Sequence, residues 1–112
     1  MKTQHSSLAE EQREYEQGLS RIVEERTRES PNDPLVWTTA RNMSGDWLMR
    51  NYYLNKMMAC IQNSGEALSY LKGIVYVRDI GRDDLREKLQ KEMIQRYPIK
   101  GRFNLLLLSF IP

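Results

Sequence analysis

The segment WLMRNYYLNKMMACI, residues 47–61, determines the fold that we expect for this chain of 112 residues. At helical spacing its large apolar side chains form one broad stripe, whose members are Trp47, Leu48, Leu54, Met57, Met58 and Ile61. The polar residue Arg50 lies mostly off that stripe. Because bulky segments both precede and follow it in the sequence, we expect this segment to form the central helix of a small bundle.

The N-terminal third of the chain carries two helix signals. Ser7 and Glu10 have the spacing of a capping box, which predicts a helix from Ser7 to about Arg28. Residues 1–6 are then left as a disordered tail. The Asp33-Pro34 pair is typical of a second helix start, with a carboxylate at the cap and proline in the first turn.

Further signals divide the rest of the chain. Ser44 is expected to cap the central helix, and the Asn63-Ser64-Gly65 run is expected to end it. Residues 74–77, IVYV, fit either a helix or a buried strand, and we favour a helix because no second strand is evident to pair with it. The clearest helix begins at residue 83 or 84, and its apolar side chains recur every four residues at Leu85, Leu89, Met93 and Tyr97.

The chain is therefore expected to be all-α, with residues 7–112 forming a single domain built as a compact bundle of four to five helices. Its C-terminal stretch is unusual, because residues 103–111 contain seven large apolar side chains in nine positions. Left in water, such a segment promotes aggregation. Two alternatives would cover it: docking on the protein's own core, or burial in a dimer interface or a partner's groove.

The residue content argues against an enzyme. His5 is the only histidine and Cys60 the only cysteine, so one chain cannot assemble a histidine-based triad, a histidine-rich metal site or a disulfide. Cys60 is expected to be a packed, unreactive thiol. No glycine-rich phosphate loop is present. We therefore expect no catalytic residues, no metal and no cofactor.

The same features indicate where the protein works. The N-terminal residues lack the apolar core of a signal peptide, and no apolar run approaches the roughly 18 residues of a membrane-spanning helix. A lone cysteine suits a reducing compartment. The expected location is intracellular, in the cytoplasm, or in a host's cytoplasm or nucleus if this is a viral or phage accessory protein, with no membrane partner.

The expected function is binding or regulation through protein–protein contact, with the protein acting as a homodimer. The apolar C-terminal stretch and the tyrosines of the central helix support this prediction, because tyrosine and large apolar side chains are frequent at such contacts. Both Tyr52 and Tyr53 are expected to keep some ring surface exposed. The candidate interface residues are Tyr52, Tyr53, Phe103, Leu105, Leu107 and Phe110.

A helical nucleic-acid-binding protein is the alternative. Basic residues are frequent between positions 78 and 102, where they could contact phosphates without reading bases. The candidate residues are Arg78, Arg82, Arg86, Lys91, Arg96 and Arg102. Acidic residues are interleaved with them and the formal net charge of the chain is only +2. This pattern is more typical of a solvated helix face, so protein–protein contact remains the favoured function.

Overall fold

The computed structural model describes residues 4–109, with side chains from Leu8 onward. All regular secondary structure in this part is helical, which confirms the all-α class. The helices number six between residues 4 and 109, more than the four to five expected. They are α1 (Gln4–Glu29), α2 (Pro34–Met43), α3 (Trp47–Ser64), α4 (Ala67–Asp79), α5 (Asp83–Arg96) and α6 (Pro98–Leu108).

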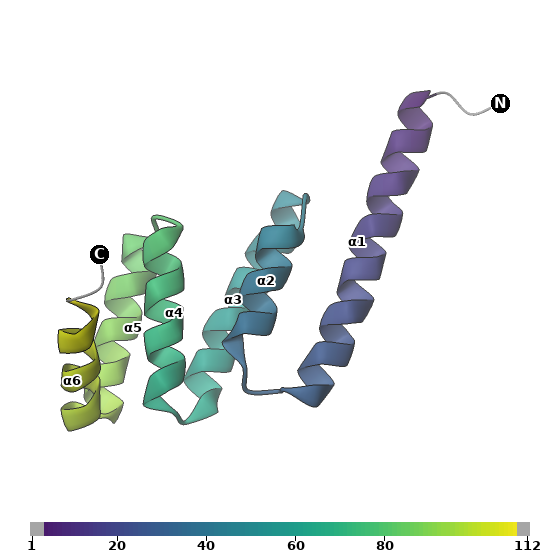
Figure 1. Cartoon of the computed structure of the whole chain (residues 1–112). Helices are drawn as coiled ribbons and strands as arrows, with labels where there is room; N and C mark the ends of the chain where they lie inside the picture. The colour runs from purple at the N-terminus through teal and green to yellow at the C-terminus, as the bar shows by residue number, and fades with distance from the viewer. Residues whose placement is uncertain (1–3, 110–112) are drawn as a thin grey trace.

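The helices stand side by side in chain order, each antiparallel to the next (Figure 1). In addition, α4 contacts both α2 and α6, so these three helices form one layer of the array. The N-terminal part of α1 extends beyond the other helices (Figure 1). The radius of gyration is 16.9 Å, against about 13 Å for a compact domain of this length. The expectation of a compact bundle was therefore wrong, because the described helices form an elongated array of 64 × 28 × 19 Å.

Helix ends follow the sequence signals in part. The Asp33 carboxylate accepts a hydrogen bond from the Leu35 amide at 3.0 Å, as the Asp33-Pro34 pair predicted. Gly65, at φ 70°, ends α3 in the left-handed region, also as predicted. The N-terminal cap of α3 was assigned wrongly, however. Asp46 caps that helix, whereas Ser44 ends α2.

The first helix begins at Gln4, which precedes the predicted cap at Ser7 and places residues 4–6 within α1. Its apolar side contacts α2 and α3 through a small cluster formed by Leu19, Val23, Ala40 and Tyr53. A polar contact lies nearer the N-terminus of α1: the Glu16 carboxylate accepts hydrogen bonds from the backbone amides of Gly45 at 2.7 Å and Asp46 at 3.2 Å. Glu16 thereby ties α1 to the turn between α2 and α3.

Four residues of the predicted stripe lie in the core, namely Leu54, Met57, Met58 and Ile61, but the first turn of the central helix does not. Trp47 and Leu48 are 73% and 70% exposed, so the prediction that they belong to the core was wrong. Arg50, which was predicted to lie mostly off the stripe, is in register with Leu54, Met57 and Ile61. Arg50 is half-buried, and its Nε atom is buried without a hydrogen-bond partner among the described residues. The apolar face therefore begins after the first turn of α3.

The main core lies between α3, α4 and α5 and consists of Leu54, Met57, Met58, Ile61, Tyr70, Ile74, Val77, Leu89 and Met93. Residues 74–77 are helical, as favoured over a strand. Gly73 explains how α4 approaches its neighbours so closely. A Cβ atom at that position would lie 2.2 Å from Ile61 Cδ1 and 3.2 Å from Leu89 Cδ1. The glycine that weakens α4 as a helix former thus permits its packing.

Candidate protein-interaction surface on helix α6

The inner side of α6 is held against the rest of the array by close packing. Gly101 is buried, and a Cβ atom there would lie only 2.9 Å from the backbone oxygen of Met93. Further along the helix, Leu105 and Leu108 pack against the main core. The absence of a side chain at Gly101 therefore allows α6 to lie directly on α5.

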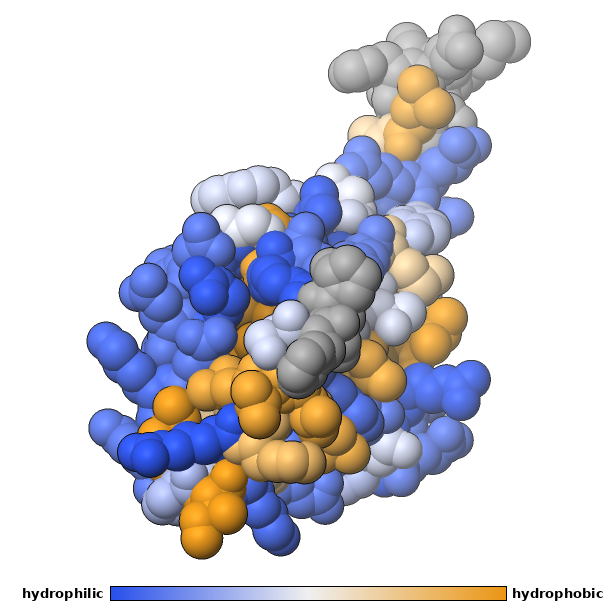
Figure 2. Space-filling model, turned by 60° about the vertical axis from the view of Figure 1, so that its left-hand side comes forward, coloured by the Kyte–Doolittle hydropathy of each residue, from blue (hydrophilic) through white to orange (hydrophobic). Residues whose placement is uncertain are grey.

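The outer side of α6 is also apolar. Ile99, Phe103 and Leu106 are 86%, 58% and 57% exposed. Their spacing of i, i+4 and i+7 places them on one face of the helix. We call these three residues the outer stripe. Figure 2 shows apolar side chains gathered over this end of the molecule, with hydrophilic surface around them.

A hollow of about 440 Å³ lies beside the outer stripe, between α6 and the start of α4. We call it the α4–α6 hollow; its lining residues are Gly65, Glu66, Ala67, Leu68, Tyr97, Lys100, Phe103 and Asn104. Leu68 is exposed on one wall and Phe103 on the other. Tyr97 lies edge-on to the buried ring of Tyr70, with centroids 6.3 Å apart. The hollow thus joins the outer stripe into one larger apolar surface.

A separate groove of about 360 Å³ runs over α4 between α2 and α6. Its apolar walls come from all three helices, since Leu35 lies on α2, Leu71 and Val75 on α4, and Leu107 and Leu108 on α6. Concave apolar surface therefore lies beside both the first half of α6 and its last turn.

The candidate interface residues of α6 divide among these surfaces. Phe103 belongs to the outer stripe and also lines the α4–α6 hollow. Leu107 lines the groove over α4. Leu105 packs inward on the main core, so it was assigned to the wrong side of the helix. Phe110 lies outside the described residues.

The two candidate tyrosines of α3 have unlike surroundings. Tyr52 is 48% exposed, and the Lys56 ammonium lies 5.5 Å from its ring centroid. Tyr53 is only 1% exposed, so the prediction of an exposed ring was wrong for this residue. Burial raises the pKa of the Tyr53 hydroxyl, and the nearby Glu16 carboxylate raises it further. Tyr53 belongs to the contact between α1, α2 and α3, remote from α6 in the array.

Several residues of this apolar surface were missed from the sequence. Ile99 and Leu106 belong to the outer stripe, and Leu68 lines the hollow. The i, i+4, i+7 spacing of Ile99, Phe103 and Leu106 was available as a signal. Leu68 could not be connected with it, because only the folded chain brings the start of α4 beside α6.

The basic residues proposed for nucleic-acid binding do not form a continuous free face. Arg78 pairs with Asp79 at 3.5 Å, Arg82 with Asp84 at 2.9 Å and Arg86 with Asp83 at 3.4 Å.

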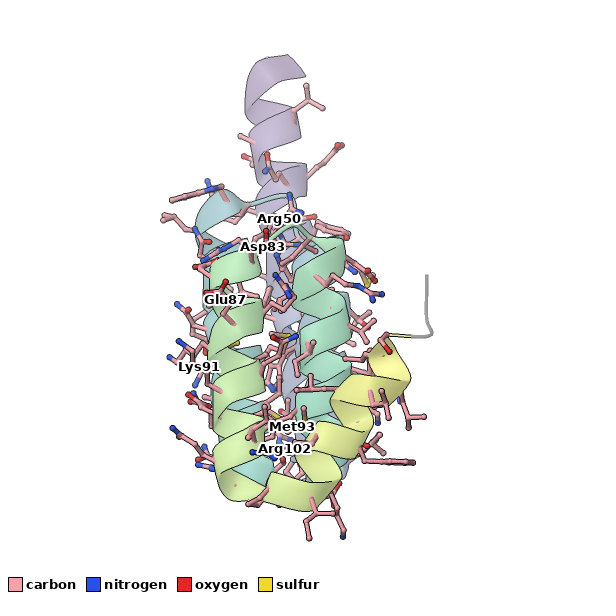
Figure 3. The ribbon with its side chains drawn as sticks, turned by 90° about the vertical axis from the view of Figure 1, so that its left-hand side faces the viewer. Arg50, Asp83, Glu87, Lys91, Met93 and Arg102 are labelled. Atoms are coloured by element: carbon pink, nitrogen blue, oxygen red, sulfur yellow. The ribbon has the colours of Figure 1, made fainter. Side chains whose placement is uncertain are left out.

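The three remaining basic candidates are Lys91, Arg96 and Arg102. Arg96 donates a hydrogen bond to the backbone oxygen of Gln62, and its guanidinium lies 5.8 Å from the Tyr70 ring centroid. Lys91 and Arg102 are exposed, and among residues 8–109 no ion pair is found for either. Figure 3 shows Asp83 and Glu87 on the same side of α5 as Lys91. Acidic groups therefore interrupt the basic surface.

The described residues also bear on the other site types. Cys60 is a free, buried thiol whose Sγ lies 3.7 Å from the Pro31 backbone oxygen, and burial raises the pKa of this thiol. Within residues 8–109, no cluster of three or more His, Cys, Asp or Glu side chains is arranged to hold a metal ion. None of the helices between residues 4 and 109 is both long and apolar enough to cross a membrane.

Comparison of the chain with protein-family models, with curated proteins and with solved structures finds no match. The function is therefore inferred from the surface itself.

Proposed function

We propose that this protein is a non-catalytic binding protein that acts through protein–protein contact, and that the outer stripe of α6 is the centre of its contact surface. The observation that carries this proposal is that α6 is apolar on opposite sides. Gly101, Leu105 and Leu108 face the core, while the outer stripe faces solvent. A helix that is apolar all round is normally buried on every side.

The energetics favour a partner on the outer stripe. Burying a large aliphatic or aromatic side chain completely stabilises by about 1.5–3 kcal/mol. Ile99, Phe103 and Leu106 all retain more than half of their exposure, so most of that free energy is still available to an association. Their position on one rigid helix also means that little conformational entropy is lost when they are covered.

A second copy of the chain is the simplest partner, because a homodimer covers the same apolar patch on both molecules. The experiment measures the dissociation constant of this dimer by sedimentation equilibrium. We expect Phe103→Gln combined with Leu106→Gln to weaken dimerisation at least tenfold, and Leu106→Gln alone to weaken it less. A wild-type protein that stays monomeric at the highest soluble concentration would overturn the homodimer.

The matched control is Leu8→Gln on α1. Leu8 and Leu106 are both leucines on helices and both are 57% exposed. The substitution removes the same apolar group at both positions without adding a charge. We expect Leu8→Gln to leave the dissociation constant unchanged, and equal effects at the two positions would show that general surface hydrophobicity drives the association.

A further inference from the structure

We propose that the partner on α6 is a second copy in a two-fold arrangement, in which Phe103 of each molecule enters the α4–α6 hollow of the other. This inference rests on the proposed function, since it specifies the contact made by the outer stripe. A two-fold interface requires a surface that complements itself. Here a projection and a hollow lie side by side on one surface: Phe103 projects from α6, and the hollow begins at its base.

The apolar parts of this surface match one another. The hollow, of about 440 Å³, is lined by Leu68 and by the ring of Tyr97. Both residues suit contact with an incoming aromatic ring, and an edge-to-face arrangement with Tyr97 would be favourable. Rotation by two-fold symmetry places Phe103 of the second copy against this pair and returns the first Phe103 to the equivalent site.

The charges at the rim of the hollow complement each other in the same arrangement. Glu66 lies on the α4 wall and Lys100 on the α6 wall, and both are exposed. Within residues 8–109 no ion pair involves either side chain. A two-fold axis through the surface brings the α6 wall of one molecule to the α4 wall of the other. Lys100 of each copy then faces Glu66 of the second copy, which makes two equivalent pairs around an apolar centre.

The size of the contact also requires the hollow. A stable dimer buries roughly 800 Å² on each partner, whereas α6 has only 11 residues and is about 16 Å long. The outer stripe alone is too small a surface for that area. Leu68, Tyr97 and the hollow between them extend the same apolar surface to the start of α4, where the contact gains the remaining area.

The test reverses each of the two charges in a separate variant. Glu66→Lys leaves only basic groups at the two walls, and Lys100→Glu leaves only acidic ones. In the two-fold arrangement either variant alone would bring like charges together twice in each dimer, so we expect its dimer to weaken at least tenfold. An equimolar mixture of the two variants should instead form a heterodimer, because each of its two contacts then pairs a basic group of one variant with an acidic group of the other. We expect the mixture to associate more tightly than either variant alone.

The mixture distinguishes the two-fold contact from attraction within one chain. If Glu66 and Lys100 attracted each other only within one chain, mixing would not restore association. Lys88→Glu makes the same charge reversal on an exposed residue of α5 outside the hollow, and it should not change dimerisation. Circular dichroism of each variant shows that it is folded before its association is measured.

Each outcome decides between the inference and the proposed function. Recovery in the mixture, with weak association of each variant alone, supports the two-fold contact. A wild-type dimer that the Phe103 and Leu106 substitutions weaken but the charge reversals do not would overturn this geometry and leave the proposed function in place. A wild-type monomer would overturn the homodimer and with it this two-fold contact. A dimer that none of these substitutions affects would place the contact elsewhere on the molecule.

Discussion

The two sides of α6 carry similar side chains but have opposite surroundings. Leu105 and Leu108 pack on the main core, while Phe103 and Leu106 remain in solvent. Hydrophobicity therefore does not decide which side is covered. Gly101 decides which side is covered, because only a residue without a Cβ atom allows the backbones of α5 and α6 to come together at that point. The uncovered side is the one that the proposed contact uses.

The largest expected effect compares how much stability is lost when a core leucine and a surface leucine are truncated. Leu89 is fully buried between α4 and α5, whereas Leu106 is 57% exposed. Leu89→Ala should lower the free energy of unfolding by about 2–5 kcal/mol, because it leaves a cavity. Leu106→Ala should change it by less than about 0.5 kcal/mol. The measurement is urea unfolding of both variants at a concentration where the wild-type protein is monomeric. Similar losses of unfolding free energy in the two variants would mean that the outer stripe is already covered within the monomer.

A second substitution tests the close approach at Gly101. In Gly101→Ala the new methyl group would lie 2.9 Å from the Met93 backbone oxygen and 3.2 Å from its carbonyl carbon. Backbone cannot move aside as a side-chain end can, so we expect a loss of about 1–3 kcal/mol in stability. Relative to the wild type, amide hydrogen exchange should also become faster, and the increase should be larger in residues 98–108 than elsewhere.

The matched control for this substitution is Gly18→Ala in α1. Gly18 also lies within a helix, but a Cβ atom there would have no neighbour within 4 Å among the described residues. Alanine is the better helix former by about 0.5–1 kcal/mol, so this variant should be more stable than the wild type. Opposite signs at the two glycines are the expected result. A stabilising Gly101→Ala would show that α6 does not pack on α5 at this point.

A smaller effect is expected for α1, which is attached in a different way from α6. In addition to its amide contacts, the Glu16 carboxylate accepts a hydrogen bond from the Ser44 hydroxyl at 2.9 Å. Glu16→Gln keeps one acceptor oxygen but removes the charge, and we expect a loss of about 1 kcal/mol in urea unfolding. Glu14→Gln, at an exposed position two residues away, is the control and should be neutral. Equal losses would point to the net charge of α1 as the cause.

The sequence predicted the helical class and several helix ends because these depend on local interactions. The Asp33 cap, the glycine at the end of α3 and the periodicity of α5 all act within a few residues. Trp47 marks the limit of such local patterns. Its large apolar side chain matched the stripe of α3, but the first turn of a helix is buried only if a neighbouring element extends past it, and no local pattern contains that information.

The apolar surface of α6 that we propose as the contact was predicted only in part, for a related reason. The apolar C-terminal stretch drew attention to Phe103, and this side chain is 58% exposed. The sequence could not show which side of α6 faced outward, because leucines occupy both sides. The position of Gly101 decides that question, and its meaning depends on the Met93 backbone opposite it. Leu105 was assigned to the interface because that contact could not be known from the sequence.

The smallest expected effect concerns an exposed ion pair at the start of α5, the end of that helix remote from the turn into α6. The Arg82 guanidinium donates two hydrogen bonds to the Asp84 carboxylate, at 3.0 and 2.9 Å, and this lowers the pKa of Asp84 from 3.8 to about 2. Because the pKa is lower in the folded state, the pair contributes its stability above about pH 4 and loses it as the pH falls towards 2. The unfolding midpoint of Asp84→Asn should therefore depend less on pH than that of the wild type between pH 4 and 2, and Arg82→Gln should reproduce this result. Since Asp84 is fully exposed, salt should weaken the difference, and a pH dependence unaffected by both substitutions would show that the pair does not persist in solution.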